Sequence, residues 1–111
     1  MRLTFVEASA FTRRIGEHGL DEDLRELQQD LLRNPEKGAL HPGTGGLRKV
    51  RMRIRSTGKG KSSGVRVHYL YLSQDGVIYL IYLYAKADQA TLTPEQKKTL
   101  RLVVEAFKRE R

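Results

Sequence analysis

The chain has 111 residues, no cysteine and a formal net charge of +8, from 21 lysines and arginines against 13 aspartates and glutamates. This length is typical of a single domain, residues 1–111, with a hydrophobic core of its own. The lack of cysteine excludes disulfides and thiolate metal sites, and the excess of positive charge favours a polyanionic partner.

The N-terminal sequence shows no sign of a secretion signal. Residues 1–6 lack an apolar run followed by a cleavage site. The longest apolar stretch, residues 77–85, is too short to span a bilayer. We therefore expect a cytoplasmic protein.

The first third of the chain predicts a short strand followed by two helices. Residues 3–6 are typical of a strand, and Phe11 and Ile15 have the spacing of a brief amphipathic helix over residues 8–16. Leucines then recur at helical spacing from residue 20 to residue 31, with three acids in the first turn, where the helix dipole favours anions. Asn34-Pro35 ends this second helix.

The middle of the chain predicts a loop and three strands. Glycines and a proline mark residues 38–46 as the loop. Residues 47–55, 65–72 and 77–84 follow as strands, and Asp75-Gly76 predicts a hairpin between the last two. Because these last two strands are apolar on both faces, we expect them at the centre of the sheet, covered on one side by helices.

The end of the chain predicts a helix from residue 94 to about residue 109. Thr93 is a favourable N-cap, Pro94 suits the first helical position, and Gln96 completes a capping box. The predicted fold class is therefore α+β: a mainly antiparallel sheet of four to five strands, two N-terminal helices and one C-terminal helix.

The basic residues are concentrated in one part of the chain. Nine lysines and arginines, and no acid, lie in residues 37–74. In residues 47–55 they alternate with apolar residues, as in a strand that buries one face and exposes cations on the other. Arginine binds phosphate with two-pronged geometry, and Arg66, His68, Tyr82 and Tyr84 on the next strands are able to stack on or hydrogen-bond to bases. We expect an RNA-facing groove rather than a merely solvated face.

Other kinds of site find little support in the sequence. His18, His41 and His68 fall in different predicted elements and form no set at metal-ligand spacing, so we expect no metal and no cofactor. The glycines of residues 43–46 lead into a strand, and no Lys-Ser/Thr follows at the distance that a phosphate loop requires. We interpret them as a turn.

Four short motifs occur in order along the chain: Gly-Thr-Gly-Gly-Leu-Arg-Lys at residues 43–49, Gly-Lys-Gly-Lys at 58–61, Gly-x-Arg at 64–66 and Tyr-Ala-Lys at 84–86. With the order of the elements, they resemble the RelE/HigB superfamily of toxins of type II toxin–antitoxin systems, most closely its HigB-like branch. The resemblance covers nearly the whole chain and implies a RelE-like fold.

The resemblance also implies an activity. Members of the superfamily are endoribonucleases (mRNA interferases) that inhibit translation by cleaving mRNA, typically in the ribosomal A site, without a metal. The ribose 2′-hydroxyl attacks the adjacent phosphate, and Arg66 matches the arginine that would stabilise the phosphorane. Arg51 and Arg53 fall where RelE-type members carry paired lysines. Because arginine keeps its proton, these two would bind charge rather than act as bases.

The residues that transfer protons stay open. A lysine that neighbouring cations help to lose its proton is one possibility. RelE-type members have an arginine where this chain has Ala87, and a later tyrosine that this chain lacks, so Tyr84 or His68 would take over the acid or stacking role. The candidate residues are therefore, for catalysis, Arg66, Lys59, Lys61, Lys86 and Tyr84, and, for RNA binding, Arg48, Lys49, Arg51, Arg53, Arg55 and His68.

Two alternatives share part of this pattern. A non-catalytic toxin of the same fold would bind a protein target such as DNA gyrase, and we would expect apolar surface in place of its basic residues. A plain RNA- or ribosome-binding module would need only the cationic sheet. The expected partners are the ribosome, mRNA and a cognate antitoxin of the helix-turn-helix type, with an acidic segment able to cover the cationic surface. No membrane is expected among them.

Overall fold

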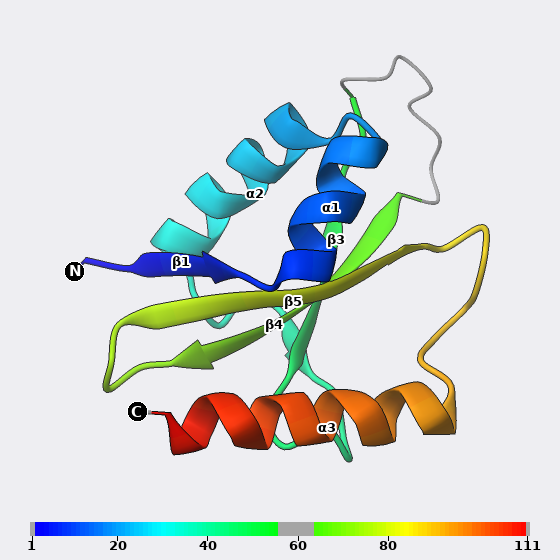
Figure 1. Ribbon diagram of the computed structural model, residues 1–111. Helices are drawn as coiled ribbons and strands as arrows, with labels where there is room; N and C mark the ends of the chain where they lie inside the picture. Colours follow the sequence, from blue (N-terminus) through cyan, green and yellow to red (C-terminus); the bar gives the residue numbers. More distant parts are fainter. Residues whose placement is uncertain (1, 56–63, 111) are drawn as a thin grey trace.

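The structure is a computed structural model and describes residues 2–55 and 64–110. Within these residues, five strands form one sheet and three helices pack against it (Figure 1). The elements in chain order are β1 (Thr4–Glu7), α1 (Ser9–Glu17), α2 (Asp21–Arg33), β2 (Ala39–Leu40), β3 (Arg48–Met52), β4 (Val65–Leu72), β5 (Val77–Ala85) and α3 (Pro94–Arg109).

The strand order in the sheet is β1-β5-β4-β3-β2. All neighbouring strands are antiparallel except β1 and β5, which are parallel. The long strands β4 and β5 lie inside the sheet and are joined by a turn that ends at Gly76, where φ is +63°. The predicted hairpin and the mainly antiparallel sheet are thus confirmed. None of the helices in residues 2–55 and 64–110 is long and apolar enough to cross a membrane.

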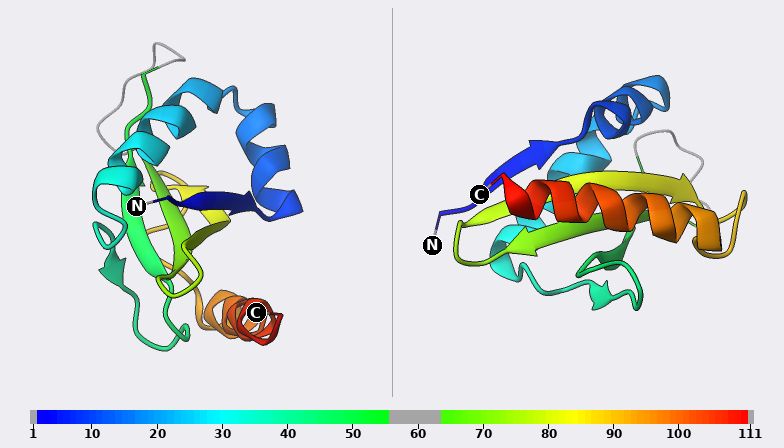
Figure 2. Two further views of the ribbon diagram at one scale, coloured as in Figure 1. Left: turned by 90° about the vertical axis from the view of Figure 1, so that its left-hand side faces the viewer. Right: turned by 60° about the horizontal axis from the view of Figure 1, so that its bottom comes forward.

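Helices cover both faces of the sheet, so the expectation that they cover only one side is wrong. α1 and α2 bury Phe11 and Leu27 against one face, while α3 buries Leu100 and Val104 against the other. Figure 2 shows α3 across the sheet from α1 and α2. The physical reason is that β4 and β5 carry apolar side chains on both faces, and each face needs a layer that shields it from water.

α3 covers only part of its face of the sheet. Its apolar residues pack over Leu47, Leu70 and Leu72, and the Phe107 ring stacks on Tyr79 with the ring centroids 4.2 Å apart. Further along the same face, Arg51 is exposed. Several of the predicted site residues lie on this side of the sheet, beyond α3 or at its edge.

A β-bulge sets the direction of the β5 side chains there. His68 pairs with Tyr82, but the next residue, Tyr69, pairs with Leu80, which leaves Ile81 as an extra residue in β5. Leu80 belongs to the core beneath α1 and α2, whereas Ile81 and Tyr82 pack on the α3 side. The bulge therefore turns Tyr82 toward the same face as His68.

The ends of the elements follow local chemistry closely. The capping box of α3 is formed, with the Gln96 backbone N–H donating to the Thr93 side chain at 3.1 Å and the Thr93 N–H donating to Gln96 at 3.0 Å.

Two strands differ from the prediction. The strand expected over residues 47–55 is shorter, Arg48–Met52, and residues 38–46 contain the two-residue strand β2, which was not predicted. β2 forms by pairing with β3 and has no signal of its own.

Candidate functional site

Two rows of side chains cross β3, β4 and β5 on the side of the sheet that α3 covers in part. Residues directly opposite each other on antiparallel strands share one face of the sheet. The strand register therefore brings together six side chains from three strands. One row is Lys49, His68 and Tyr82, and the other is Arg51, Arg66 and Tyr84.

Arg51 and Arg66 form the cationic centre of these rows. They are paired directly across β3 and β4, and like charges directly opposite each other on a sheet repel. A bound anion would offset that repulsion. Two guanidinium groups offer several donors in planar forks, which suit the oxygens of a phosphate.

His68 is the buried part of the site. Its side chain is 0% exposed, and neither ring nitrogen has a hydrogen-bond partner within the described part of the chain. Its ring lies among other rings, with centroids 5.5 Å from His41, 5.7 Å from Tyr84 and 6.4 Å from Tyr82. Burial, and then the charges of His41 and Lys49, lower the pKa of His68 from 6.5 to about 4, so its imidazole is neutral near pH 7.

Tyr82 is fixed from two directions. The Gln96 side-chain amide donates to the Tyr82 hydroxyl at 3.0 Å, and the Arg14 guanidinium lies over the Tyr82 ring, 5.5 Å from its centroid, while donating to the Leu83 carbonyl at 2.6 Å. Tyr82 also borders a hollow of about 440 Å³ beside α3. The other residues lining this hollow are Glu95, Gln96, Thr99 and Leu100.

Tyr84 lies beneath the surface next to the arginines. Its side chain is 4% exposed, and within the described residues its hydroxyl makes no hydrogen bond of good geometry. Burial raises the pKa of Tyr84 above its ordinary value of 10, although the positive charge of Arg66 and the nearby Thr91 side chain act in the opposite direction. Tyr84 therefore keeps its proton at neutral pH and is unsuited to act as a base.

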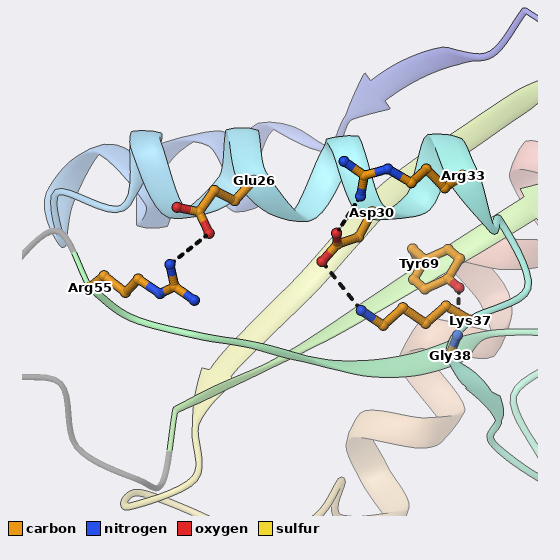
Figure 3. A network of polar contacts seen from close by, with 7 residues as sticks. All are labelled: Glu26, Asp30, Arg33, Lys37, Gly38, Arg55 and Tyr69. Carbon is orange, nitrogen blue, oxygen red and sulfur yellow. Dashed lines mark hydrogen bonds and ion pairs between the residues drawn. The ribbon is translucent and has the colours of Figure 1, made fainter.

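A second concave surface lies between α2 and β3, with a volume of about 700 Å³. Its walls carry opposite charges, because Glu26 and Asp30 of α2 face lysines and arginines of the β3 side. Figure 3 shows the ion pairs that bridge it, Glu26–Arg55 at 3.7 Å and Asp30–Lys37 at 3.3 Å. Lys49 and Arg51 of the rows also border this hollow, so the two surfaces meet along β3. Because the acids of α2 repel a polyanion, the part of the rows around Arg66, away from α2, is the better candidate for binding phosphate.

Comparison with known proteins assigns the family. The family model described as "RelE toxin of RelE / RelB toxin-antitoxin system" matches residues 7–110. The chain belongs to the RelE toxin family. The fold agrees: a solved structure of an E. coli RelE toxin mutant in the free state superposes with a TM-score of 0.59 at 17% identity, over 81% of this chain and 90% of that chain. The predicted superfamily and α+β fold are confirmed, while the HigB-like branch stays a prediction.

Several of the predicted residues of this RelE-family toxin lie away from the two rows. The Arg48 guanidinium donates to the backbone carbonyls of Gly38 at 2.7 Å and Glu36 at 3.2 Å. Because side chains alternate along β3, Arg48 lies on the face of the sheet opposite Lys49. Its contacts are those of a structural residue, and its part in RNA binding stays a prediction. Arg55 is held by Glu26.

Two of the remaining predicted residues flank the rows, and the other two lie outside the described residues. Arg53 is exposed just beyond β3. Lys86 is exposed just beyond β5, where its backbone N–H donates to Gly64 at 3.3 Å, one residue before β4 and the Arg66 strand. Lys59 and Lys61 lie outside the residues that the structure describes.

Two residues that the sequence did not single out also belong to this RelE-family site. His41 precedes the glycine loop and contacts His68, and Lys97 of α3 lies close enough for its charge to act on His41. Neither carries a local sequence signal, because each reaches the site through the packing of segments far apart in the chain.

Proposed function

We propose that this toxin is a ribosome-dependent mRNA endoribonuclease that cleaves by attack of the ribose 2′-hydroxyl on the adjacent phosphate, without a metal. The observation that carries the proposal is the facing pair of Arg51 and Arg66 on an uncovered part of the sheet. In-line attack creates a phosphorane with more negative charge than the ground state. Fixed guanidinium donors stabilise that charge more than they stabilise the substrate.

The residues of the two rows, and the cations beside them, have different roles in the proposed reaction. Arg66 stabilises the phosphorane, Arg51 binds the adjacent phosphate, and Lys49 adds a positive charge beside the scissile phosphate. Because the Tyr84 hydroxyl is buried, Tyr84 acts as a positioning residue next to Arg66 and does not touch the substrate. Lys86 and Arg53 extend the cationic surface along the RNA backbone, where they add salt-dependent affinity rather than catalysis.

The row that contains His68 and Tyr82, called the aromatic row below, suits the bases of the same RNA. The hollow beside Tyr82 has a volume of about 440 Å³ and brings an aromatic ring together with the amide of Gln96. Single-stranded RNA is usually recognised by stacking on such rings and by hydrogen bonds to base edges. The surface as a whole fits an unpaired mRNA segment better than a duplex.

The proposed partners are the ribosome, mRNA and a cognate antitoxin. A chain with a net charge of +8 associates readily with ribosomal RNA, and an acidic antitoxin segment lying over the two rows would block the substrate by charge and by volume. Co-expression with the antitoxin would then protect Arg51 and Arg66 from modification by an arginine-specific reagent.

The test is primer extension on a defined mRNA, free and on programmed ribosomes, with purified wild type, Arg66→Ala and Arg33→Ala. Arg33 is a matched exposed arginine on α2 that pairs with Asp30. We expect cuts only on ribosomes, unaffected by EDTA, with a rate about 10²–10³-fold lower in Arg66→Ala and unchanged in Arg33→Ala. Ribosome binding should persist in both variants.

Absence of any cut by the wild type, with and without ribosomes, would overturn the proposal. The non-catalytic alternative, inhibition of a protein target such as DNA gyrase, would then be tested by a supercoiling assay. Equal loss of cleavage in Arg66→Ala and Arg33→Ala would show that general positive charge, and not the facing pair, supports the activity.

A further inference from the structure

The turn between β2 and β3 holds an imidazole against the edge of the candidate site. His41 is partly exposed, and its ring meets the buried His68 ring edge-on, with centroids 5.5 Å apart and planes at 63°. One side of the His41 ring is thus packed on the aromatic row, and the residue keeps contact with solvent.

The glycine motif that follows His41 forms a hydrogen-bonded turn that anchors His41 and is centred on the buried Thr44. The His41 backbone N–H donates to the Leu47 carbonyl at 2.8 Å, the Thr44 hydroxyl donates to the His41 carbonyl at 2.6 Å, and the Leu47 N–H donates to the Thr44 hydroxyl oxygen at 3.1 Å. Thr44 is 0% exposed. Gly43 and Gly45 have φ of +81° and +79°, a region that favours glycine. The motif therefore fixes the position of one backbone segment and the imidazole it carries.

The charged and titratable groups around His41 come from three elements. They are Lys49 of β3, His68 of β4 and Lys97 of α3. Burial, then the positive charges of Lys49 and Lys97, lower the pKa of His41, so that the imidazole is neutral at pH 7 and free to accept a proton.

Other groups of the site are poorly suited to accept a proton. Arginines hold theirs at any working pH, Tyr84 is protonated and buried, and His68 is fully buried. His68 and Arg66 are two residues apart on the same face of β4, about 7 Å along the strand. A phosphate held at Arg66 is therefore near enough for its ribose to reach the imidazoles, of which His41 is the one in contact with solvent.

Resting on the proposed function, we propose that His41 is the general base of the cleavage, and that the loop of residues 43–47 serves to hold it in place. The His41 imidazole takes the proton of the 2′-hydroxyl as the new bond from the 2′-oxygen to phosphorus forms. The bond from phosphorus to the 5′-oxygen breaks, and that oxygen leaves with the electron pair and gains a proton from an ammonium group, for which Lys49 is placed. The His41 proton then returns to Lys49 through water. The products are a cyclic phosphate and a 5′-hydroxyl.

The experiment is single-turnover cleavage on programmed ribosomes as a function of pH, with wild type, His41→Asn and His18→Asn. His18 is an exposed histidine at the end of α1 and serves as the matched control. We expect the wild-type rate to rise with pH in the acidic range and to level off near neutrality. His41→Asn should lose about 10²–10⁴-fold in rate and the pH-dependent rise, with ribosome binding unchanged, while His18→Asn keeps both.

Two further measurements keep the inference open to refutation even if His41→Asn is poorly folded. Added imidazole should restore part of the activity of His41→Ala, which a purely structural role of His41 does not predict. Thr44→Val, which loosens the anchor but keeps the imidazole, should cut more slowly with the acidic rise retained.

The outcomes separate this inference from the proposed function. Full activity of His41→Asn, or a slow variant that keeps the acidic rise and is not restored by imidazole, overturns the role of His41 and leaves the nuclease standing. No cleavage by the wild type overturns the nuclease, and the general base falls with it.

Discussion

The burial of a neutral His68 predicts that the protein loses stability on mild acidification. The unfolded chain binds a proton at His68 below pH 6.5, whereas the folded chain binds one only near pH 4. Since the unfolded state holds more protons in this window, stability falls as the pH falls. With these two values the loss is about 2 kcal/mol between pH 7.5 and pH 5, and about 3 kcal/mol once the pH is below 4.

The variant that isolates this effect is His68→Ile. Isoleucine suits a central strand, does not titrate and has no polar atoms to leave unpaired. Replacing a buried polar group that lacks partners with an apolar group of similar size is neutral or stabilising. We therefore expect His68→Ile to be at least as stable as wild type at pH 7.5, and to exceed it by about 2 kcal/mol more at pH 5.

Urea unfolding at the two pH values, for both proteins, measures this difference. The chain has no tryptophan, so far-UV circular dichroism is the suitable signal, and equal slopes against urea would show that the unfolding transition is the same. The shared carboxylates and His41 titrate in both proteins and cancel in the comparison. A parallel loss of stability in the two proteins, or a clearly less stable His68→Ile at pH 7.5, would refute a neutral, unpaired imidazole.

Three substitutions test contacts outside the site, each by urea unfolding. Tyr69→Phe removes the hydroxyl that donates to the Pro35 carbonyl at 2.7 Å and accepts from the Gly38 N–H at 2.9 Å. It should cost about 1–3 kcal/mol because a buried donor loses its partner, and no change would mean that water replaces the hydroxyl. Thr93→Ala breaks the capping box with Gln96 and should cost about 1 kcal/mol; a neutral result would show that the first turn of α3 frays. Gly38→Ala places a methyl group 2.9 Å from a β3 carbonyl and from the Tyr69 ring, and should cost about 1–3 kcal/mol, unless β2 detaches without affecting the fold.

The sequence predicted the elements well where their signals are local. The leucine spacing of α2, the capping box of α3 and the Asp75-Gly76 turn each depend on residues within a few positions of one another. β2 was missed because its two residues become a strand only by pairing with β3. The position of α3 across the sheet from α1 and α2 depends on long-range packing, although the two apolar faces of β4 and β5 already indicated that a second layer was needed.

The site was predictable in composition but only partly in geometry. Alternation along β3 already places Arg48 and Lys49 on opposite faces of the sheet, because neighbouring residues in a strand point to opposite faces. The pairing of Arg51 with Arg66 requires the strand register, and the direction of Tyr82 requires the bulge at Ile81. Neither can be derived from the sequence of one strand.

The contrast between the two basic surfaces argues for function at the rows. Along α2 the chain pairs cations with acids, as Glu26 does with Arg55 and Asp30 with Lys37. At the rows it sets two arginines directly opposite each other and buries an imidazole without a hydrogen-bond partner in the described structure. The buried imidazole lowers the stability of the free protein through its loss of hydration. Local violations of the rules that stabilise a fold concentrate where a ligand compensates for them, and for a row of facing cations that ligand is an anion.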